Sequence, residues 1–238
     1  PVKEQTICSV DLGINTDAVC TIMRPDGTIL GRKFINFPSD KDRMYRVLGR
    51  IRRFQREHGS RQVQGRWAYA KRLNTELGKK IAREIVFYAS ENRADVIVFE
   101  YLEMKGKLSG KKKQKLQMWR KRDIQKRCGQ QAHRKGIRIS RICAWNTSRL
   151  AFDGSGKIDR DIQDHRLCTF QNGKRYNCDL SASYNIGARY FIREILKPLP
   201  ATERSLLEAK VPAVKRRTSC VYADLRDLIS EMELQKAA

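Results

Sequence analysis

Long apolar runs are missing from this 238-residue sequence, and the signatures of several protein classes are missing with them. No stretch approaches the ~20 apolar residues that span a membrane. No charged and then apolar leader with a small-residue cleavage site opens the chain, which argues against secretion. The seven cysteines are an odd number scattered along the sequence, a pattern typical of reduced cytosolic thiols and not of a disulfide framework. We therefore expect a cytoplasmic protein without a membrane partner.

Acidic residues are also scarce relative to basic ones. The chain has 26 Asp and Glu against 50 Lys and Arg, which gives a net charge of +24. Such a charge repels itself and weakens the compact state unless a polyanion neutralises it. Nucleic acid, an acidic membrane and an acidic protein are the three partners that could do so. Because the basic residues are spread over several predicted helices, the composition favours nucleic acid.

The pattern of apolar residues predicts a mixed α/β fold. Three short strands joined by tight turns indicate an antiparallel meander. A later continuous apolar run is typical of a central strand beside a parallel neighbour. Strand–helix–strand crossovers after a meander predict a mixed sheet with helices on its faces. The expected strands cover residues 6–13, 18–23, 28–37, 95–100 and 136–142, and the expected helices cover 41–93, 116–135 and 182–196.

Three acidic residues stand out by their positions. Asp11 ends the first predicted strand, Glu100 ends the central one, and Asp179 lies just before the helix predicted from residue 182. If the first and fourth strands are neighbours, Asp11 and Glu100 lie side by side at carboxyl ends, where ligand sites of open α/β sheets form. Clustered carboxylates repel each other when ionised, and a hard cation such as Mg²⁺ removes that difficulty.

Two Mg²⁺ or Mn²⁺ ions held ~3.5–4 Å apart by such a cluster would activate water and stabilise the leaving oxygen in phosphodiester hydrolysis. The alternative is that each acid is a turn or cap residue, and Asp179 by itself is a plausible helix cap. Three acids at these positions in a strongly basic chain favour the metal-dependent interpretation.

At these residues the sequence resembles the RuvC domain of the TnpB transposon-associated nucleases and their type V CRISPR effector relatives. The matching stretches follow the family's order over roughly residues 5–196, and they are Val10-Asp11-Leu12-Gly13-Ile14-Asn15, Val96-Ile97-Val98-Phe99-Glu100 and Asp179-Leu180-Ser181-Ala182-Ser183-Tyr184-Asn185-Ile186-Gly187. The resemblance implies an RNase H-like (RuvC-type) fold and RNA-guided cleavage of DNA. It also implies that Asp11, Glu100 and Asp179 are the ligands of catalytic Mg²⁺ or Mn²⁺.

The same resemblance implies guide RNA and target DNA as partners, in a prokaryotic-type cytoplasm close to the nucleoid. In the family, guide-binding and target-recognising domains precede the first strand. Here that strand is predicted to begin at Thr6, so we expect the chain to be the catalytic portion of a longer protein or to act with a partner chain.

The resemblance divides the chain into four parts. They are a RuvC-like nuclease core with basic helices and a lid-like loop, a small irregular insertion, the final motif with its helix, and an extension without an assigned role, over residues 1–142, 143–178, 179–198 and 199–238.

The insertion lies where the family usually carries a four-cysteine zinc ribbon. The first Cys-x-x-Cys should follow Thr147-Ser148, but residues 149–154 contain no cysteine. Cys168 and Cys178 remain nearby and are spaced too widely for such a knuckle. Because tetrahedral zinc accepts both cysteine and histidine, a site built from His165, Cys168, Cys178 and Cys143 is conceivable. We expect a zinc-free insertion.

Basic residues near these motifs are candidates for phosphate contacts, and a solvated helix face is the alternative for any one of them. The candidates are Arg50, Arg53, Lys111, Lys112, Lys113, Arg120 and Arg122. Aromatic side chains among them suit either stacking on unpaired bases or a helical core. Those aromatic residues are Trp67, Tyr69, Trp119 and Trp145.

Two other functional classes remain open. Asp11-Leu12-Gly13-Ile14-Asn15 also looks like the first phosphate motif of the sugar-kinase and actin superfamily, but no second glycine-rich hairpin follows Glu100. The other class is a binding module, either a nuclease-inactive RNA-guided DNA-binding protein or a basic RNA-binding protein. Acids at all three catalytic positions argue against inactivation without proving turnover.

Overall fold

The computed structural model describes residues 4–59, 63–101, 121–216 and 218–237, and its centre is a five-stranded mixed sheet in the order β3-β2-β1-β4-β5. β1, β2 and β3 form an antiparallel meander, while β4 runs parallel to both β1 and β5. The predicted meander and the predicted parallel neighbour of the apolar run are therefore confirmed. The strands are β1 (Ile7–Asp11), β2 (Ala18–Met23), β3 (Ile29–Ile35), β4 (Val96–Tyr101) and β5 (Arg138–Cys143).

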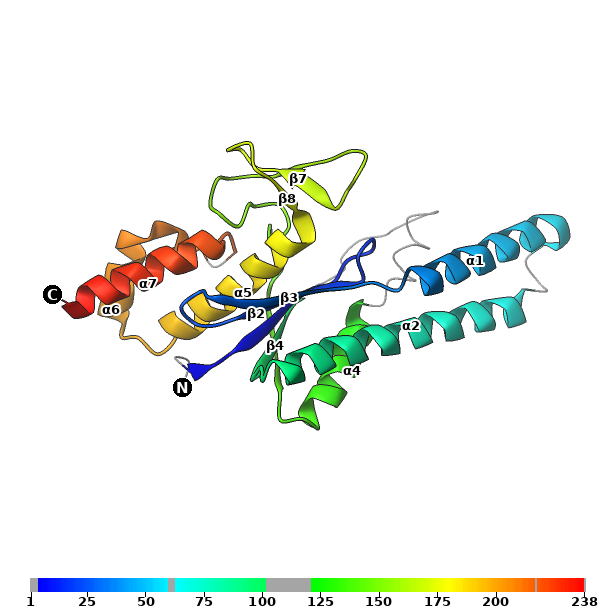
Figure 1. The fold of residues 1–238 in the computed structure, drawn as a ribbon, viewed down its shortest axis with the longest axis horizontal. Helices are drawn as coiled ribbons and strands as arrows, with labels where there is room; N and C mark the ends of the chain where they lie inside the picture. Colours follow the sequence, from blue (N-terminus) through cyan, green and yellow to red (C-terminus); the bar gives the residue numbers. More distant parts are fainter. Residues whose placement is uncertain (1–3, 60–62, 102–120, 217, 238) are drawn as a thin grey trace.

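Helices cover both faces of this sheet (Figure 1). α5, with α6 and α7 behind it, covers one face, and α2 with α4 covers the other. The helices are α1 (Pro38–His58), α2 (Gln64–Glu91), α4 (Lys121–His133), α5 (Cys178–Leu196), α6 (Ala201–Lys210), the short 3₁₀ helix η2 (Pro212–Lys215) and α7 (Tyr222–Ala237). No helix within the described ranges is both long and apolar enough to cross a membrane.

Alternation along the strands divides the buried side chains between two cores. Successive residues of a strand point to opposite faces. Ile7 and Val98 accordingly join the core under α5, which we call the α5 face. Cys8 and Ile97 join the core under α2 and α4, which we call the α2/α4 face. β1, β2 and most of β4 are buried along their length because both of their faces are covered, as the apolar runs predict.

α5 lies unusually close to the sheet. A Cβ atom on Gly187 would come within 2.9 Å of Cε of Met23, so only glycine allows this approach. Near the same level, Thr21 Oγ1 and Ser183 Oγ are joined by a 2.6 Å hydrogen bond between strand and helix. Close packing and a buried polar contact together fix the position of α5 relative to β1 and β2.

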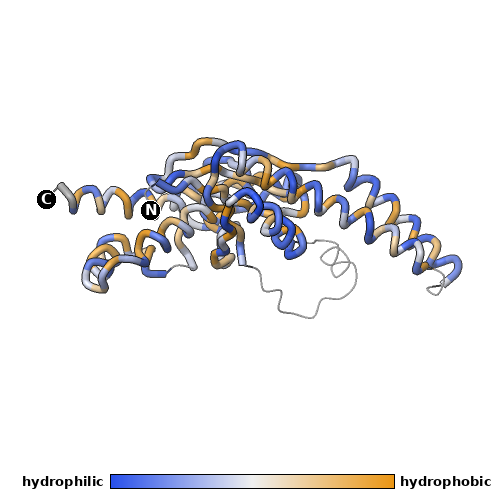
Figure 2. Tube along the Cα trace, turned by 90° about the horizontal axis from the view of Figure 1, so that it is seen from below, coloured by the Kyte–Doolittle hydropathy of each residue, from blue (hydrophilic) through white to orange (hydrophobic). Residues whose placement is uncertain are grey.

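The segment predicted to be helical over residues 41–93 consists of two antiparallel helices, a division that the apolar pattern did not place. α1 ends at Gly59, whose φ of 74° lies in the left-handed region that glycine tolerates. The two helices project from the sheet as a hairpin (Figure 2). A small separate core holds them together, built from Met44, Ile51 and Ala70 with Val47, Leu48, Trp67 and Leu73.

The insertion over residues 143–178 is more regular than predicted. It contains a three-stranded antiparallel sheet of β6 (Asp159–Arg160), β7 (Leu167–Thr169) and β8 (Arg175–Asn177). Its own core is formed by Ala151, Cys168, Phe170 and Cys178 with flanking aromatic rings. Strands of two and three residues are too short to show a periodicity of two in sequence, which explains why they were missed.

The extension over residues 199–238 has a structural role that the sequence did not reveal. Leu207, Val214, Leu225 and Leu228 are fully buried and join the core under α5. The extension therefore covers the outer side of α5 and completes that core.

Candidate active site

Asp11 and Glu100 lie on neighbouring strands at the same edge of the sheet. In the parallel pairing of β1 and β4, Val10 is opposite Phe99, so the next residue of each strand is one of the two acids. Alternation turns both side chains onto the α5 face, since Val10 and Phe99 point to the α2/α4 face. Asp11 is 7% exposed and Glu100 is 8% exposed. The structure thus brings together the two acids that the sequence predicted to be neighbours.

Asp179 reaches the same edge from the first turn of α5. The helix begins at Cys178 and not at residue 182, so the predicted position of Asp179 just before the helix was wrong. Its alternative role as the cap is also wrong, because Asn177 is the cap and its side chain accepts a 2.9 Å hydrogen bond from the Leu180 N–H. The N-terminal end of a helix carries partial positive charge, which favours an ionised carboxylate at Asp179.

The three carboxylates act on one another electrostatically. Burial, followed by the charges of Glu100 and Asp179, raises the pKa of Asp11 to about 8 against the opposing charge of Lys121. Burial also raises the pKa of Asp179, while a hydrogen bond from Thr16 and the charge of Arg160 lower it. Mutual repulsion of buried carboxylates is the property that a bound cation relieves.

Lys121, the first residue of α4, lies among these acids. Its Nζ is 3.9 Å from Glu100 Oε2, and its side chain is only 12% exposed. Burial lowers the pKa of Lys121, and the carboxylates of Asp11, Glu100 and Asp179 raise it in opposition. Sequence analysis missed this residue because one lysine in a long basic segment carries no distinguishing signal.

A set of hydrogen bonds behind Glu100 holds its carboxylate. Thr147 donates its hydroxyl to Glu100 Oε1. Asn185 of α5 donates to the carbonyl oxygens of Thr147 and Leu150 at 3.0 and 2.9 Å. The sequence could have indicated Asn185, because this residue lies inside the third matching stretch. Thr147 had no distinguishing sequence pattern beyond its place in the Thr-Ser pair.

Arg189, one turn further along α5, ties the same region together. Its guanidinium donates to the carbonyl oxygens of Cys143 and Trp145 at 2.9 and 2.6 Å. It also donates to the carbonyl oxygen of Cys220 at 2.8 Å, which links the C-terminal extension to this loop. Arg189 is 4% exposed, so these contacts replace water that a charged group would otherwise need.

The donor set fits a hard divalent cation. All three acids offer carboxylate oxygens, which Mg²⁺ and Mn²⁺ prefer, and their buried charges repel each other without a cation. As the side chains lie, no group of three or more His, Cys, Asp or Glu among the described residues is arranged to hold a metal ion. Binding would therefore require Asp11, Glu100 and Asp179 to rotate toward a common point.

Two of the four candidate zinc ligands lie together. A hydrogen bond links the thiols of Cys168 and Cys178 inside the small core of the insertion. The ring of His165 is instead bonded to the carbonyl oxygen of Asp161 at 3.1 Å, and Cys143 is exposed at the end of β5.

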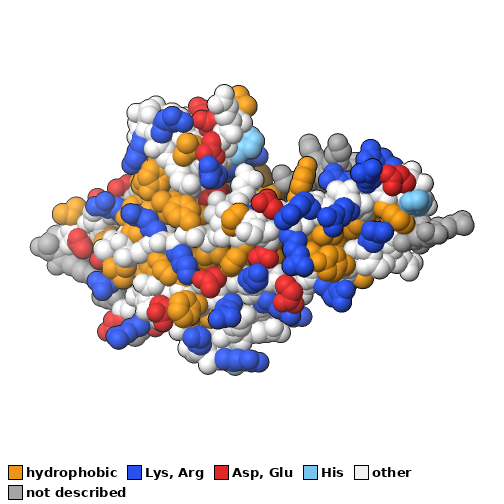
Figure 3. Space-filling model, turned by 45° about the vertical axis from the view of Figure 1, so that its right-hand side comes forward, with side chains coloured by type: hydrophobic (Ala, Val, Ile, Leu, Met, Phe, Trp, Pro, Cys, Tyr) orange, Lys and Arg blue, Asp and Glu red, His pale blue; other side chains and the backbone are white. Residues whose placement is uncertain are grey.

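The candidate phosphate-binding residues fall into two groups. Arg50 and Arg53 are exposed on α1, and Arg122 is exposed on α4 beside the acidic edge. Lys and Arg side chains are spread over the face that includes the hairpin (Figure 3). The other candidates lie outside the described residues, and they are Lys111, Lys112, Lys113 and Arg120, together with Trp119 of the aromatic set.

The remaining aromatic candidates differ in exposure. Trp67 is partly buried against the core of the hairpin, as expected for an aromatic residue at helical spacing. Tyr69 and Trp145 are 36% and 67% exposed, so their rings can be reached from solvent.

A mixed five-stranded sheet flanked by helices, with acids where the central strands end, defines an RNase H-like α/β fold, as predicted. Two solved structures share it. A Cas12f1–sgRNA–target DNA complex matches with a TM-score of 0.60 and 19% sequence identity over 76% of this chain. A CRISPR-Cas12f ternary complex matches with a TM-score of 0.53 and 16% sequence identity, also over 76% of this chain. At these identities the similarity establishes the fold alone.

The chain spans 49% and 38% of the length of those two chains. Thermus thermophilus RuvC aligns over 96% of this chain and 97% of its own, with 10% identity and a TM-score of 0.32. No known family model and no curated protein matches the sequence.

Proposed function

We propose that this chain is the catalytic portion of an RNA-guided DNA endonuclease that hydrolyses phosphodiester bonds with divalent metal ions. The observation that carries the proposal is the meeting of Asp11, Glu100 and Asp179 at one edge of the sheet, in a chain of net charge +24. The RNA guide and the DNA target come from the Cas12f complexes that share the fold. Recognition of a target would reside in a further part of the protein or in a partner chain.

In this proposal the three acids hold the metal ions. Two divalent cations held by these carboxylates would supply an activated water and would stabilise the leaving oxygen of a phosphodiester. Asp11 and Glu100 present their carboxylates from adjacent strands, so their spacing is fixed by the sheet. Asp179 presents its carboxylate from the start of α5, which Gly187 seats closely on that sheet.

Further residues keep these ligands in position. Thr147 holds Glu100 in one orientation, and Asn185 holds the backbone of Thr147. Lys121 compensates part of the negative charge when no metal is bound, because its ammonium group lies among the carboxylates. The exposed basic residues, including Arg122 beside this edge, would bind the phosphates of the strand to be cut.

A nuclease-inactive, RNA-guided DNA-binding protein is the second candidate function. The absence of a metal-holding group among the described residues, with the side chains as they lie, is the observation that favours it. The two candidates share the nucleic-acid surface and differ only at the acidic edge.

Incubation of the chain with labelled single-stranded DNA separates the two candidates. Mg²⁺ and Mn²⁺ reactions are run beside an EDTA control and an Asp11→Ala control, and binding is measured on the same samples. We expect cleavage that is lost in both controls, with DNA affinity unchanged or higher in Asp11→Ala because a negative charge is removed.

Binding without cleavage, both by the chain alone and after reconstitution with a recognition half and guide RNA, would support the inactive binding protein. Loss of binding together with cleavage in Asp11→Ala would show that Asp11 is structural and would remove the basis of the proposal.

A further inference from the structure

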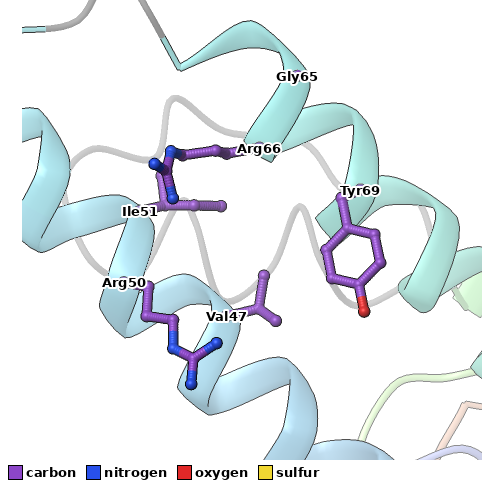
Figure 4. A pocket seen from close by; sticks show the side chains of 6 residues that line it. All are labelled: Val47, Arg50, Ile51, Gly65, Arg66 and Tyr69. Atoms are coloured by element: carbon purple, nitrogen blue, oxygen red, sulfur yellow. The ribbon is translucent and has the colours of Figure 1, made fainter.

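A cavity of about 280 Å³ opens between the two helices of the hairpin, away from the acidic edge (Figure 4). Val47, Arg50 and Ile51 line it from α1, and Gly65, Arg66 and Tyr69 line it from α2. Small-molecule sites begin at roughly 300 Å³, so the cavity suits one small ligand and not a helix or an extended peptide.

One side of the cavity is apolar and held in place. Ile51 is 1% exposed and belongs to the hairpin core, with Val47 packed beside it. The ring of Tyr69 is fixed at its far end, where the hydroxyl accepts a 2.7 Å hydrogen bond from Arg43. The partly buried Val47 and the ring of Tyr69 are therefore the apolar surfaces that a flat group can reach, and their fixed positions lower the entropic cost of binding.

Two cations also line the cavity. Arg50 and Arg66 contribute guanidinium groups, and Arg66 reaches from α2 toward α1 with its charge 4.1 Å from the ring centroid of Phe54 (Figure 4). Residues 43–58 and 64–72 together contain nine Lys and Arg and one acid, Glu57. That acid pairs with Arg53 at 3.0 Å and so does not neutralise the cavity.

Gly65 lines the cavity and has open space beside it. Gly65 lies inside α2, where glycine is a poor helix former, and a Cβ atom there would meet no atom within 4 Å. A larger side chain would therefore occupy free space at the cavity without displacing any neighbour. This makes Gly65 the cleanest position at which to block the cavity.

We propose that this cavity binds one unpaired nucleotide of a nucleic-acid strand, with the base against Val47 and Tyr69. Arg50 and Arg66 would hold the adjoining phosphate, since a guanidinium matches phosphate oxygens with two parallel hydrogen bonds. Apolar and aromatic side chains beside two cations fit a flat ring that carries an anionic group, which is the chemistry of a nucleotide. The inference rests on the proposed nucleic-acid function and adds a single-nucleotide site that is distinct from the catalytic edge.

The test measures binding of the full chain to fluorescein-labelled oligothymidine and oligouridine of about 12 nucleotides, in EDTA so that no strand is cut. Gly65→Leu blocks the cavity, and Arg50→Gln/Arg66→Gln removes its cations. Arg56→Gln/Lys71→Gln is the matched control, because it removes two positive charges from exposed positions of the same two helices outside the cavity.

We expect Gly65→Leu to weaken binding about 5- to 100-fold, the effect of losing one stacked base. The cavity double variant should lose more than the control double variant, which should change affinity only a few-fold, about 2- to 5-fold. Oligonucleotides carrying 5-iodouracil should crosslink to Tyr69 in the wild type and fail to do so in Gly65→Leu. Comparison of the DNA and RNA arms identifies which strand supplies the nucleotide.

Equal affinities of Gly65→Leu and wild type, or equal losses in the two double variants, would overturn the nucleotide site and leave a uniformly charged surface. Failure of the proposed function has a different signature. If the wild type binds through the cavity but never cuts DNA with Mg²⁺, only the nuclease proposal fails. If the wild type cuts DNA and Gly65→Leu binds as tightly as the wild type, only the nucleotide site fails.

Discussion

The two faces of the central sheet are built from the same strands and differ in chemistry. On the α2/α4 face the strands contribute apolar side chains such as Val10, Ile22 and Ile97. On the α5 face they also contribute Ser9, Thr21, Asp11 and Glu100, all of them buried. A buried polar group is costly without a hydrogen-bond partner, so the α5 face must supply such partners, whereas the α2/α4 face supplies only apolar packing.

The hydrogen-bond partners come from α5 and from the loop that side chains of α5 hold in place. Ser183 bonds Thr21, while Asn185 and Arg189 fix the loop that carries Thr147 to Glu100. The α2/α4 face thus contributes apolar packing, and the α5 face contributes apolar packing together with the buried acids of the proposed site. Substitutions on the two faces should therefore separate activity from stability.

The largest effect is expected for Glu100→Gln on the α5 face. The amide keeps the shape and an oxygen that can accept the Thr147 hydrogen bond, but it loses the charge needed to bind a divalent cation. We expect cleavage of single-stranded DNA to fall on the order of 10⁴-fold, or ~5.5 kcal/mol of activation free energy. Glu84→Gln, which removes an acid that pairs with Lys33 on the surface, is the control and should cut normally. Equal losses in both variants would contradict the separation of the two faces.

Ile97→Ala on the α2/α4 face should produce the opposite result. Ile97 is fully buried between Cys8 and Ile139, and its loss leaves a cavity. The expected loss is about 3–4 kcal/mol in the free energy of unfolding, measured by urea denaturation. At low temperature the folded variant should retain its cleavage rate within about twofold, since the acids lie on the other face. A loss of cleavage in fully folded protein would show that the two faces are coupled.

Stability should depend on pH through the buried acids of the α5 face. The pKa of Asp11 is raised from 3.8 to about 8, so the folded state binds its proton more tightly than the unfolded state does. Stability is then greatest below the unfolded pKa and falls as pH rises toward the folded pKa. In EDTA we expect thermal denaturation to report a loss on the order of 2 kcal/mol between about pH 6 and 8. Asp11→Asn should abolish that slope, and an unchanged slope in this variant would assign it to another group.

The smallest effect is expected for Lys121→Gln, which removes the cation that already lies among the acids. Without that charge, Mg²⁺ meets less repulsion, and its half-saturation concentration should fall about tenfold, or ~1.4 kcal/mol. Isothermal titration with Mg²⁺ measures this directly. Arg122→Gln, next along α4 but exposed, is the control and should change the value less. Weaker Mg²⁺ binding in Lys121→Gln would mean that the lysine positions Glu100 and does not compete with the metal.

The sequence predicted the sheet well because buried strands depend on local patterns. Apolar runs around Val10 and Val98 define buried strands, and the acid that ends each run is visible directly. The break between α1 and α2 was also visible at Gly59, but the helical texture on both sides concealed it.

The residues that support the acids could not be predicted, because their roles arise from distant contacts. Thr147 lies 47 residues from Glu100 in sequence, and Arg189 reaches a carbonyl oxygen 31 residues away. The start of α5 was missed for a local reason. Its first turn, Cys178-Asp179-Leu180-Ser181, contains few strong helix formers, and the helix begins there because Asn177 caps it.

The contacts of Arg189 and Asn185 bear on how far the chain can be shortened. Arg189 donates to the carbonyl oxygen of Cys220, and Asn185 accepts a 3.1 Å hydrogen bond from the Tyr222 N–H. The same two side chains hold the loop behind Glu100. Truncation at Pro198, after the final motif and its helix, would remove one hydrogen-bond partner from each of these two side chains. It would also expose the apolar side of α5 that the extension covers. The smallest portable unit of this acidic edge therefore runs through α7.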